Sequence, residues 1–452
     1  MFAMVTFGFT LVSCIGFWVC GIQLIYAELL LKPASSPVIQ DKPFVVVWNM
    51  PTARCQWNYG IDLPLGVFDI IKNKGDHFKG QNMTIFYKNK FGLYPYITKD
   101  DEIVYKGVPQ RVNMRDHLKI VTRDVKSLLF EDFSGLAVID WEEWRPLWAQ
   151  NWGLKRIYKE FSKYLVRTRQ PYLTDREATR VAKKEFEIGA QNFLRKTLKT
   201  VRRLRFSGLW GMYGFPECFN SNWRKVRRYT GHCHKEDIQR NNQLAWLWKA
   251  SSALYPSVYL HKNLSSTEEA WKFVHYRVKE ALRAAAFGSP SALPVLPYSR
   301  VAYMHSPKYL SEIDLVHTIG ESAAMGTAGV VLWSDLSFAK SVRRCESLQN
   351  YIWNVLGTYV LNVTTSMQLC SQRLCGGNGR CVRKEVDTPS YLHLNPESFR
   401  ITRVVTGTQG EQELSVVGEL LETDFKKMNE AFMCHCYRGW HGAHCLKNSV
   451  HS

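Results

Sequence analysis

The stretch GLAVIDWEEWRPLWAQNW, residues 135–152, decides the fold that we expect for this chain. It begins with a continuous apolar run after a glycine, which is typical of a strand covered on both faces, as in a parallel sheet. Side chains alternate along a strand, so Asp140 and Glu142 are predicted on one face and the intervening Trp141 on the other. The stretch therefore predicts a buried strand that ends in two neighbouring carboxylates.

Two carboxylates on one face of a strand influence each other's ionisation. Their alpha carbons would lie about 6 to 7 Å apart, so the charge of one group raises the pKa of the other. The pair then holds one proton, and glycoside hydrolysis needs one protonated and one charged carboxyl group. The competing interpretation is a solvated acidic loop that pairs with Arg145. The carboxylate pair alone does not distinguish a catalytic pair from a solvated loop, so other features of the chain are needed.

Short apolar runs recur along the chain and alternate with long amphipathic segments. The segments 176–204 and 268–286 carry apolar residues at helical spacing. Alternating strands and helices predict an α/β fold with a parallel sheet. About seven such units indicate a distorted TIM-like (β/α) barrel, with an open doubly wound sheet as the alternative. The apolar runs lie at 44–49, 83–87, 135–142, 209–215, 256–260, 294–300 and 328–333.

Each run carries a polar or aromatic side chain near its end. Active groups of (β/α) barrels gather at the C-terminal ends of the strands. Aromatic rings stack on sugar faces, so a ring of them around an acidic pair indicates a carbohydrate site. Burial between barrel and helices is the competing explanation for each single aromatic residue. These residues are Trp48, Asn49, Tyr87, Asp140, Glu142, Tyr213, Tyr259, Tyr298 and Trp333.

The N-terminal segment predicts the cellular route. Residues 1–27 carry no charge and are nearly all apolar, which is typical of a signal peptide cleaved after Ala27. The segment lacks a basic start and is long enough to span a bilayer, so an uncleaved anchor is the alternative. We expect a secreted or extracellular protein, with a lysosomal or vesicular location as a second option. Membrane attachment is expected only if this segment is retained.

The cysteines predict a disulfide-rich C-terminal module. Two of the twelve, Cys14 and Cys20, lie within the predicted signal, and six cluster in 370–445 among closely spaced glycines. A secretory route favours disulfides over zinc. The spacing resembles an EGF-like module, which we expect over 362–448 beside a barrel over 34–361; the sequence alone allows fifteen pairings of the six. Glycosylation sequons at Asn82, Asn263 and Asn362 agree with this route.

The chain is strongly basic. Its formal charge of +19 and its pI near 9.4 call for a polyanionic environment or partner. Basic clusters lie at 183–184, 199–205 and 223–228. No nucleic-acid-binding pattern is present, so no nucleic acid partner is expected and an acidic extracellular polysaccharide fits better. A basic surface tuned for solubility is the competing explanation for each cluster.

Several of these stretches resemble the vertebrate hyaluronidases, a glycoside hydrolase family with secreted, venom-type and sperm-type members. The resemblance runs from about Pro43 to Cys445, and the D-W-E-x-W-R-P pattern is its most specific part. It implies endo-hydrolysis of the β-1,4 bonds between N-acetylglucosamine and glucuronate in hyaluronan, with retention, by a monomer without metal or cofactor. The stretches are FSGLAVIDWEEWRPLWAQNW, NMTIFYKNKFGLYPYI, GLWGMYGFPECFN, ALYPSVYL, GESAAMGTAGVVLW and CGGNGRCVRK.

The resemblance also implies roles for individual residues. Glu142 would be the general acid that protonates the glycosidic oxygen and then the base that activates water. The acetamido carbonyl of the substrate would attack the anomeric carbon, while Asp140 holds the acetamido nitrogen and keeps Glu142 protonated. Such an intramolecular attack gains from prepaid orientation. Tyr259 and Trp333 would shape the acetamido pocket, Tyr213 and Tyr87 would contact the sugar near the cleaved bond, and Arg277 would meet a substrate carboxylate.

The resemblance further implies disulfide pairs and reveals two departures from the family pattern. Glu217 stands where many members have Asp, and Phe219 stands where Tyr is common. Loss of that tyrosine hydroxyl puts affinity or substrate preference in question. Arg145 is expected to pair with a neighbouring carboxylate. The implied pairs are Cys55 with Cys345, Cys218 with Cys233, Cys370 with Cys381, Cys375 with Cys434, and Cys436 with Cys445.

Two further hypotheses stay open. A surface protein that binds hyaluronan or chondroitin sulfate, with weak or chondroitin-directed activity, needs only a basic cleft of the right shape. An enzyme that prefers chondroitin would differ only in its contacts to individual sugars. The presence of both Asp140 and Glu142 beside the aromatic residues favours an enzyme.

Overall fold

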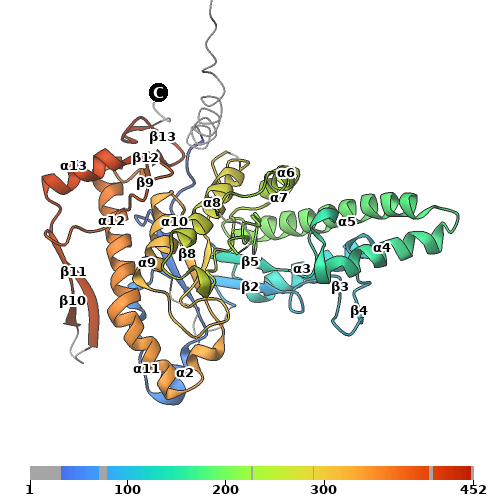
Figure 1. Cartoon of the computed structure of the whole chain (residues 1–452), viewed down its shortest axis with the longest axis horizontal. Coiled ribbons are helices and arrows are strands. Elements are labelled where there is room, and N and C mark those ends of the chain that lie inside the picture. The colour runs from blue at the N-terminus through green and yellow to red at the C-terminus, as the bar shows by residue number, and fades with distance from the viewer. Residues whose placement is uncertain (1–31, 71–78, 225–227, 289, 407–410, 449–452) are drawn as a thin grey trace, which may run out of the picture.

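The computed structural model describes residues 32–448 except 71–78, 225–227, 289 and 407–410 (Figure 1). The predicted signal peptide, 1–27, lies outside the described residues. None of the helices within these ranges combines the length and the apolar character that crossing a membrane requires.

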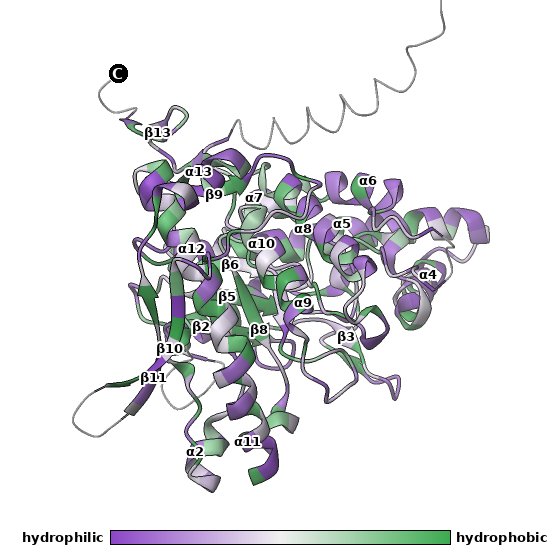
Figure 2. Ribbon diagram, turned by 60° about the vertical axis from the view of Figure 1, so that its left-hand side comes forward, coloured by the Kyte–Doolittle hydropathy of each residue, from purple (hydrophilic) through white to green (hydrophobic). Residues whose placement is uncertain are grey.

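Two parallel three-stranded sheets form the centre of the molecule. Their strands are buried over most of their length and lie among helices, which are more hydrophilic on their outer faces (Figure 2). The first sheet has the order β2-β5-β6 and the second the order β1-β8-β7. Their bounds are Met83–Tyr87 for β2, Leu136–Asp140 for β5, Leu209–Met212 for β6, Val45–Asn49 for β1, Gly329–Trp333 for β8 and Tyr298–Arg300 for β7.

Isolated parallel bridges connect the two sheets through the segment 254–257. Tyr255 bridges to Tyr213 beside β6, and Ser257 bridges to Tyr298 in β7. On the far side, Ile70 bridges to Val47 in β1. Among the described residues, the recorded pairing runs as an arc from Ile70 through both sheets to β2. The predicted α/β class with parallel strands is confirmed, whereas closure of the barrel stays a prediction.

The prediction of seven full strands is wrong in two places. The run 256–260 makes only isolated bridges, and in the run 294–300 only the last three residues form a strand. Pro256, Pro294 and Pro297 explain the difference, because proline has no N–H to donate to a strand ladder.

Long helices cover the central strands, and two of them match the amphipathic segments expected from the sequence. Helix α5, Asp175–Leu204, begins at a capping box in which Thr174 and Glu177 bond to each other's backbone N–H. It packs antiparallel against α4, and the pair projects from the body of the molecule (Figure 1). The second expected helix is α8. The bounds are Met114–Leu128 for α3, Arg156–Arg169 for α4, Lys235–Gln243 for α6, Ala245–Ala250 for α7, Glu268–Ala285 for α8 and Glu321–Ala324 for α10.

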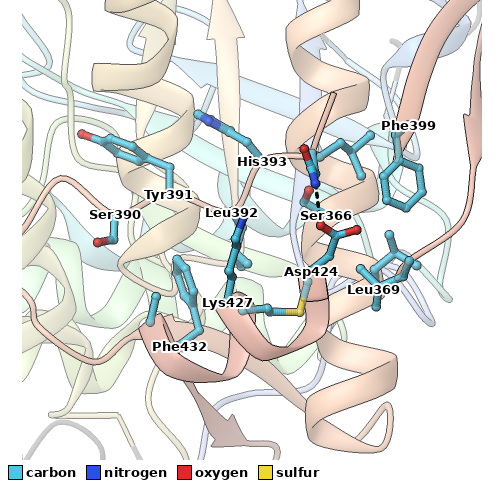
Figure 3. A pocket seen from close by; sticks show the side chains of 15 residues that line it. Ser366, Leu369, Ser390, Tyr391, Leu392, His393, Phe399, Asp424, Lys427 and Phe432 are labelled. Carbon is cyan, nitrogen blue, oxygen red and sulfur yellow. Dashed lines mark hydrogen bonds between the residues drawn. The ribbon is translucent and has the colours of Figure 1, made fainter. Parts of the chain in front are cut away.

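The C-terminal part is joined to the body by a helix and by disulfides. Helix α12, Gly357–Cys375, runs across the expected boundary at 361–362. Beyond it lie the antiparallel pairs β9–β12, β10–β11 and β13–β14, and helix α13. Their bounds are Gly379–Arg383, Phe432–Cys436, Phe399–Thr406, Glu411–Gly418, Trp440–His441, Lys447–Asn448 and, for α13, Glu422–Ala431. A pocket of about 350 Å³ lies between α12 and α13 (Figure 3). Two of its lining residues are joined by the hydrogen bond that Asn395 donates to Asp424.

All five disulfides have the pairing that the family resemblance implied. Cys55–Cys345 ties α2, Ala53–Tyr59, to α11, Val342–Tyr351, and Cys218–Cys233 closes a short loop. In the C-terminal part, the pairs are Cys370–Cys381, Cys375–Cys434 and Cys436–Cys445. The first two fasten α12 to β9 and β12, so the small module is anchored to the helix that leads into it.

A polar network, buried at His275, Glu321 and Arg383, also joins the C-terminal part to the helices. His275 on α8 contacts Glu321 on α10 through Nδ1 at 2.7 Å and Asp387 through Nε2 at 2.9 Å. Arg383 on β9 donates to the same Glu321 at 2.6 Å. Each buried charge thereby has an opposite charge or a hydrogen-bond partner, as burial demands.

Candidate active site

The strand ends bring the predicted carboxylate and tyrosine side chains together. In the parallel register, Asp140 at the end of β5 stands beside Tyr87 at the end of β2. Tyr213, directly after β6, donates its backbone N–H to the carbonyl of Ile139 at 3.0 Å. Residues far apart in the sequence therefore meet at one edge of the parallel strands, as expected for this class of fold.

The two central carboxyl groups occupy unlike environments. Burial, and then the negative charge of Glu142, raise the pKa of Asp140 to about 7. Its Oδ1 atom is buried without a hydrogen-bond partner among the described residues. Glu142, by contrast, is exposed. Asp140 can thus carry a proton near neutral pH and offer an unused polar atom, while Glu142 is accessible to a ligand.

Two buried tryptophans hold Glu142 outward. Trp141 and Trp144 stack on Tyr94, with ring centroids 4.8 Å and 5.2 Å away. Trp144 also donates its ring N–H to the carbonyl of Pro95 at 2.8 Å. The predicted alternation is seen, because Trp141 points into the core and Glu142 into solvent.

Arg145 pairs with a carboxylate distant in sequence, which argues against the solvated acidic loop. Its guanidinium binds Glu217, and the side chains are 14% and 8% exposed. Gln150 donates to the second oxygen of Glu217 at 2.9 Å. Arg145 also donates to the backbone carbonyl of Glu142 at 3.2 Å, so it fixes the loop without occupying either central carboxylate. Glu217, a departure from the family pattern, therefore retains a cationic partner.

An aromatic group lines the edge beside Asp140. Tyr213 lies 5.1 Å from Tyr298 and 6.3 Å from Tyr259 between ring centroids. Tyr259 and Trp333 face each other at 6.2 Å with planes 16° apart. Near-parallel, partly exposed rings are suited to contact the flat faces of a sugar.

The tyrosine hydroxyls beside Asp140 stay protonated. Burial and then the negative charge of Asp140 raise the pKa of Tyr87 to about 12. Burial also raises the pKa of Tyr213. Both groups can therefore donate a hydrogen bond to a ligand at neutral pH.

Arg277 reaches the same region from helix α8. It donates to Oδ1 of Asn220 at 2.9 Å and to the carbonyl of Ser257 at 2.7 Å, and its guanidinium lies 4.1 Å from the ring centre of Phe273. Burial lowers its pKa to about 10, which leaves it charged at neutral pH. A fixed, desolvated cation of this kind suits a carboxylate ligand.

Some of the residues expected at the site lie elsewhere. Trp48 is fully buried, stacks on Phe68 at 4.7 Å and donates to Thr52, so burial in the core explains it. Tyr298 is also buried, and its ring packs edge to face against that of Tyr213. Asn49 donates to the hydroxyl of Tyr298 at 3.5 Å, and its own Oδ1 lacks a partner among the described residues.

One residue beside the aromatic pair was missed by the sequence analysis. Arg300, the last residue of β7, lies with its guanidinium 5.6 Å and 5.2 Å from the ring centres of Tyr259 and Trp333. It donates to Ser334 at 3.3 Å. Its place at the end of the run 294–300 is the signal that could have identified it.

The remaining site residues are placed as follows. Phe219 meets the exposed Trp152 edge to face at 5.8 Å. Asn82 and Asn263 are exposed, whereas Asn362 is half-buried and accepts a hydrogen bond from the backbone of Leu394 at 2.9 Å. Within the described ranges, no three His, Cys, Asp or Glu side chains are grouped to hold a metal ion.

Comparison with known proteins gives the family. The family model described as hyaluronidase matches residues 33–449. The hyaluronidase of Crotalus adamanteus is 40% identical over 97% of this chain and 98% of its own length. Hyaluronidase-1 of Cerastes cerastes is 42% identical over 92% of this chain and 93% of its own length.

The fold comparison gives the same family. A crystal structure of bee venom hyaluronidase in complex with a hyaluronic acid tetramer is 33% identical, with a TM-score of 0.63, and covers 70% of this chain and 98% of the bee chain. Near-complete matches to several hyaluronidases, together with an acidic pair framed by tyrosines at the strand ends, leave one conclusion. This chain is a member of the hyaluronidase family of glycoside hydrolases, family 56.

Proposed function

We propose that this chain cleaves the β-1,4 bonds between N-acetylglucosamine and glucuronate in hyaluronan by a substrate-assisted, retaining mechanism. The observation that carries the proposal is the pairing of a half-buried Asp140, whose pKa is raised to about 7, with an exposed Glu142 beside it. The bee venom relative, whose structure contains a hyaluronic acid tetramer, supports this choice of substrate.

Glu142 acts on the glycosidic oxygen in this mechanism. In the first step it donates its proton to the leaving oxygen as the carbon–oxygen bond breaks, because an exposed carboxyl at the edge can reach that atom. In the second step the resulting carboxylate takes a proton from water, which attacks the anomeric carbon. The same residue thus serves as acid and then as base, as retention of configuration requires.

Asp140 orients the substrate's own nucleophile. The acetamido carbonyl oxygen attacks the anomeric carbon from the face opposite to the leaving group and forms a cyclic oxazolinium intermediate. The unpartnered Oδ1 of Asp140 is available to the acetamido N–H, whose acidity grows as positive charge develops. Holding this amide in place supplies orientation before the reaction begins.

The surrounding residues would bind the reacting sugars. Tyr259 and Trp333 provide facing rings for the acetamido group, and Tyr87 and Tyr213 provide hydroxyl donors near the cleaved bond. The cation of Arg277 would meet a glucuronate carboxylate. Chondroitin is the second candidate substrate, since Phe219 lacks the hydroxyl that is common in the family at that position.

The other untested features follow from this assignment. We infer a closed (β/α) barrel over 34–361, an EGF-like module over 362–448 and glycosylation at Asn82, Asn263 and Asn362. A chain with a cleaved signal peptide and these disulfides would be secreted, and the similar hyaluronidase of bee venom agrees with an extracellular enzyme.

The mechanism is tested with a Glu142→Gln variant. Glutamine keeps the shape of the side chain but has no acidic proton, so depolymerisation of hyaluronan should fall to background. Size analysis of the polymer at acidic and neutral pH measures this. Binding of hyaluronan should remain, because the aromatic and cationic contacts are intact. Turnover by this variant would show that the acid has been assigned to the wrong residue. The same assay on chondroitin separates the two candidate substrates.

A further inference from the structure

A second groove lies on the projecting helices, apart from the strand ends. It is formed by the C-terminal half of α4, the middle of α5 and the short turn Pro109–Arg111, and it encloses about 980 Å³. This volume is at the upper end of the range for small-molecule sites, which is about 300 to 1,000 Å³. We call it the hairpin groove and use six of its lining residues: Arg111, Tyr164, Arg169, Lys184, Glu185 and Ile188.

The hairpin groove carries an exposed aromatic and aliphatic surface. Tyr164 is 62% exposed and Ile188 is 49% exposed, which is unusual for large apolar side chains. The ring of Tyr164 stacks on Phe161 at 6.2 Å between ring centroids with planes 17° apart, so Phe161 packs against one side of it. An exposed aromatic ring can serve as a platform for the face of a sugar.

The groove also carries uncompensated positive charge. Arg111 and Lys184 are exposed, and neither makes an ion pair among the described residues. The third cation, Arg169, is neutralised by Glu185, with contacts at 2.9 Å and 2.7 Å. The two unpaired cations come from different elements, the turn Pro109–Arg111 and α5, and line the same groove as Tyr164 and Ile188. This arrangement matches a polymer whose carboxylates are separated by neutral sugars.

The position of the groove relative to the acidic pair favours an extended ligand. Lys155, one residue before α4, binds the backbone carbonyl of Glu142, so the start of α4 is next to the acid. Tyr164 and Arg169 lie about 12 to 20 Å further along the helix at 1.5 Å per residue. A tetrasaccharide centred on the acid would end before the groove, whereas a long chain could occupy both.

We propose that the hairpin groove is a second binding site for the anionic polysaccharide substrate and holds a segment of chain that extends beyond the cleaved bond. This inference rests on the proposed function, because it takes the same polymer as ligand. Occupying both sites on one chain raises the effective concentration of the polymer at the acid. The groove should therefore lower the KM for long hyaluronan and leave the cleavage of short oligosaccharides unchanged.

The test compares two double variants that remove the same charge. Arg111→Gln with Lys184→Gln alters the groove. Lys126→Gln with Lys183→Gln is the matched control, because these exposed lysines lie on α3 and α5 but do not line the groove. We expect the groove variant to raise the KM for long hyaluronan about three- to tenfold, as for loss of two exposed charge contacts. Its kinetics on a hyaluronan tetrasaccharide should stay at parental values. The control variant should keep parental kinetics on both substrates.

Binding measured without turnover separates failure of the groove from failure of the proposed function. Both double variants are introduced into the Glu142→Gln background, and affinity for long hyaluronan is measured directly. Weaker binding by the groove variant alone supports the proposal even if the parental chain prefers another polymer for cleavage. Equal affinities for the two variants would overturn it. In the chain that keeps Glu142, a loss of tetrasaccharide cleavage by the groove variant as large as its loss on long hyaluronan would also overturn it. Tyr164→Ala, with thermal unfolding as a check of folding, provides a third variant that leaves the net charge unchanged and is expected to weaken only long-chain binding.

Discussion

Replacement of Asp140 by asparagine should make the protein more stable at neutral pH while removing its activity. The carboxyl group is partly buried, and its pKa is raised from 3.8 to about 7. Folding therefore favours its protonated form. As pH rises from about 4 towards 7, this group lowers the free energy of unfolding by an increasing amount. Asparagine has a similar shape and never ionises, so the free energy of unfolding of the Asp140→Asn variant should not fall over this pH range on account of this residue.

The size of the effect follows from the shift in pKa. A shift of about three units corresponds to about 4 kcal/mol at 1.36 kcal/mol per unit. Partial exposure and coupling to Glu142 reduce this value, so we expect the variant to gain about 1 to 3 kcal/mol over the parent at pH 7.5. The gain should shrink as pH falls towards 4, because below about pH 4 the carboxyl is protonated in both the native and the unfolded state.

Urea unfolding at pH 4.5, 6 and 7.5 measures this difference. The parent and the Asp140→Asn variant are compared at each pH, with Asp132→Asn, an exposed position, as the control. The stability difference between the Asp132→Asn control and the parent should not rise with pH. A stability difference between the Asp140→Asn variant and the parent that is the same at all three pH values would refute the burial argument. A gain in stability with loss of turnover would identify Asp140 as a site where function is kept at the expense of stability.

Two other perturbations have outcomes set by the structure. Glu217→Ala leaves the buried guanidinium of Arg145 without its partner, so the free energy of unfolding, measured with heat or urea, should fall by about 3 to 5 kcal/mol. Glu217→Asp should restore most of this loss. A loss below about 1 kcal/mol would mean that water replaces the carboxylate. Hyaluronan binding should weaken as sodium chloride rises from low to high concentration, because the charge of +19 attracts a polyanion through screened interactions; an affinity that is flat across this range would contradict a charge-driven contact.

The sequence by itself determined the local elements. The run 135–140 predicted β5, and the apolar spacing of 176–204 and 268–286 predicted α5 and α8, because a buried face imposes its period on neighbouring residues. The alternation in DWEE predicted that Trp141 and Glu142 face opposite ways, and in the structure Trp141 is buried whereas Glu142 is exposed. The pairing of the cysteines came only from the family resemblance, since spacing alone left it open.

Only the tertiary structure decided which distant residues meet. Arg145 could have paired with Asp140 or Glu142, yet it binds Glu217, 72 residues away, and Trp48 joins the core although it stands at a strand end like Trp333. The end of the run 294–300 marks Arg300 as a strand-end residue, but its contact with Tyr259 and Trp333 appears only in the folded chain, as does the hairpin groove. Periodicity reports which face of an element is buried, whereas partners, burial and the resulting pKa values depend on how whole elements pack.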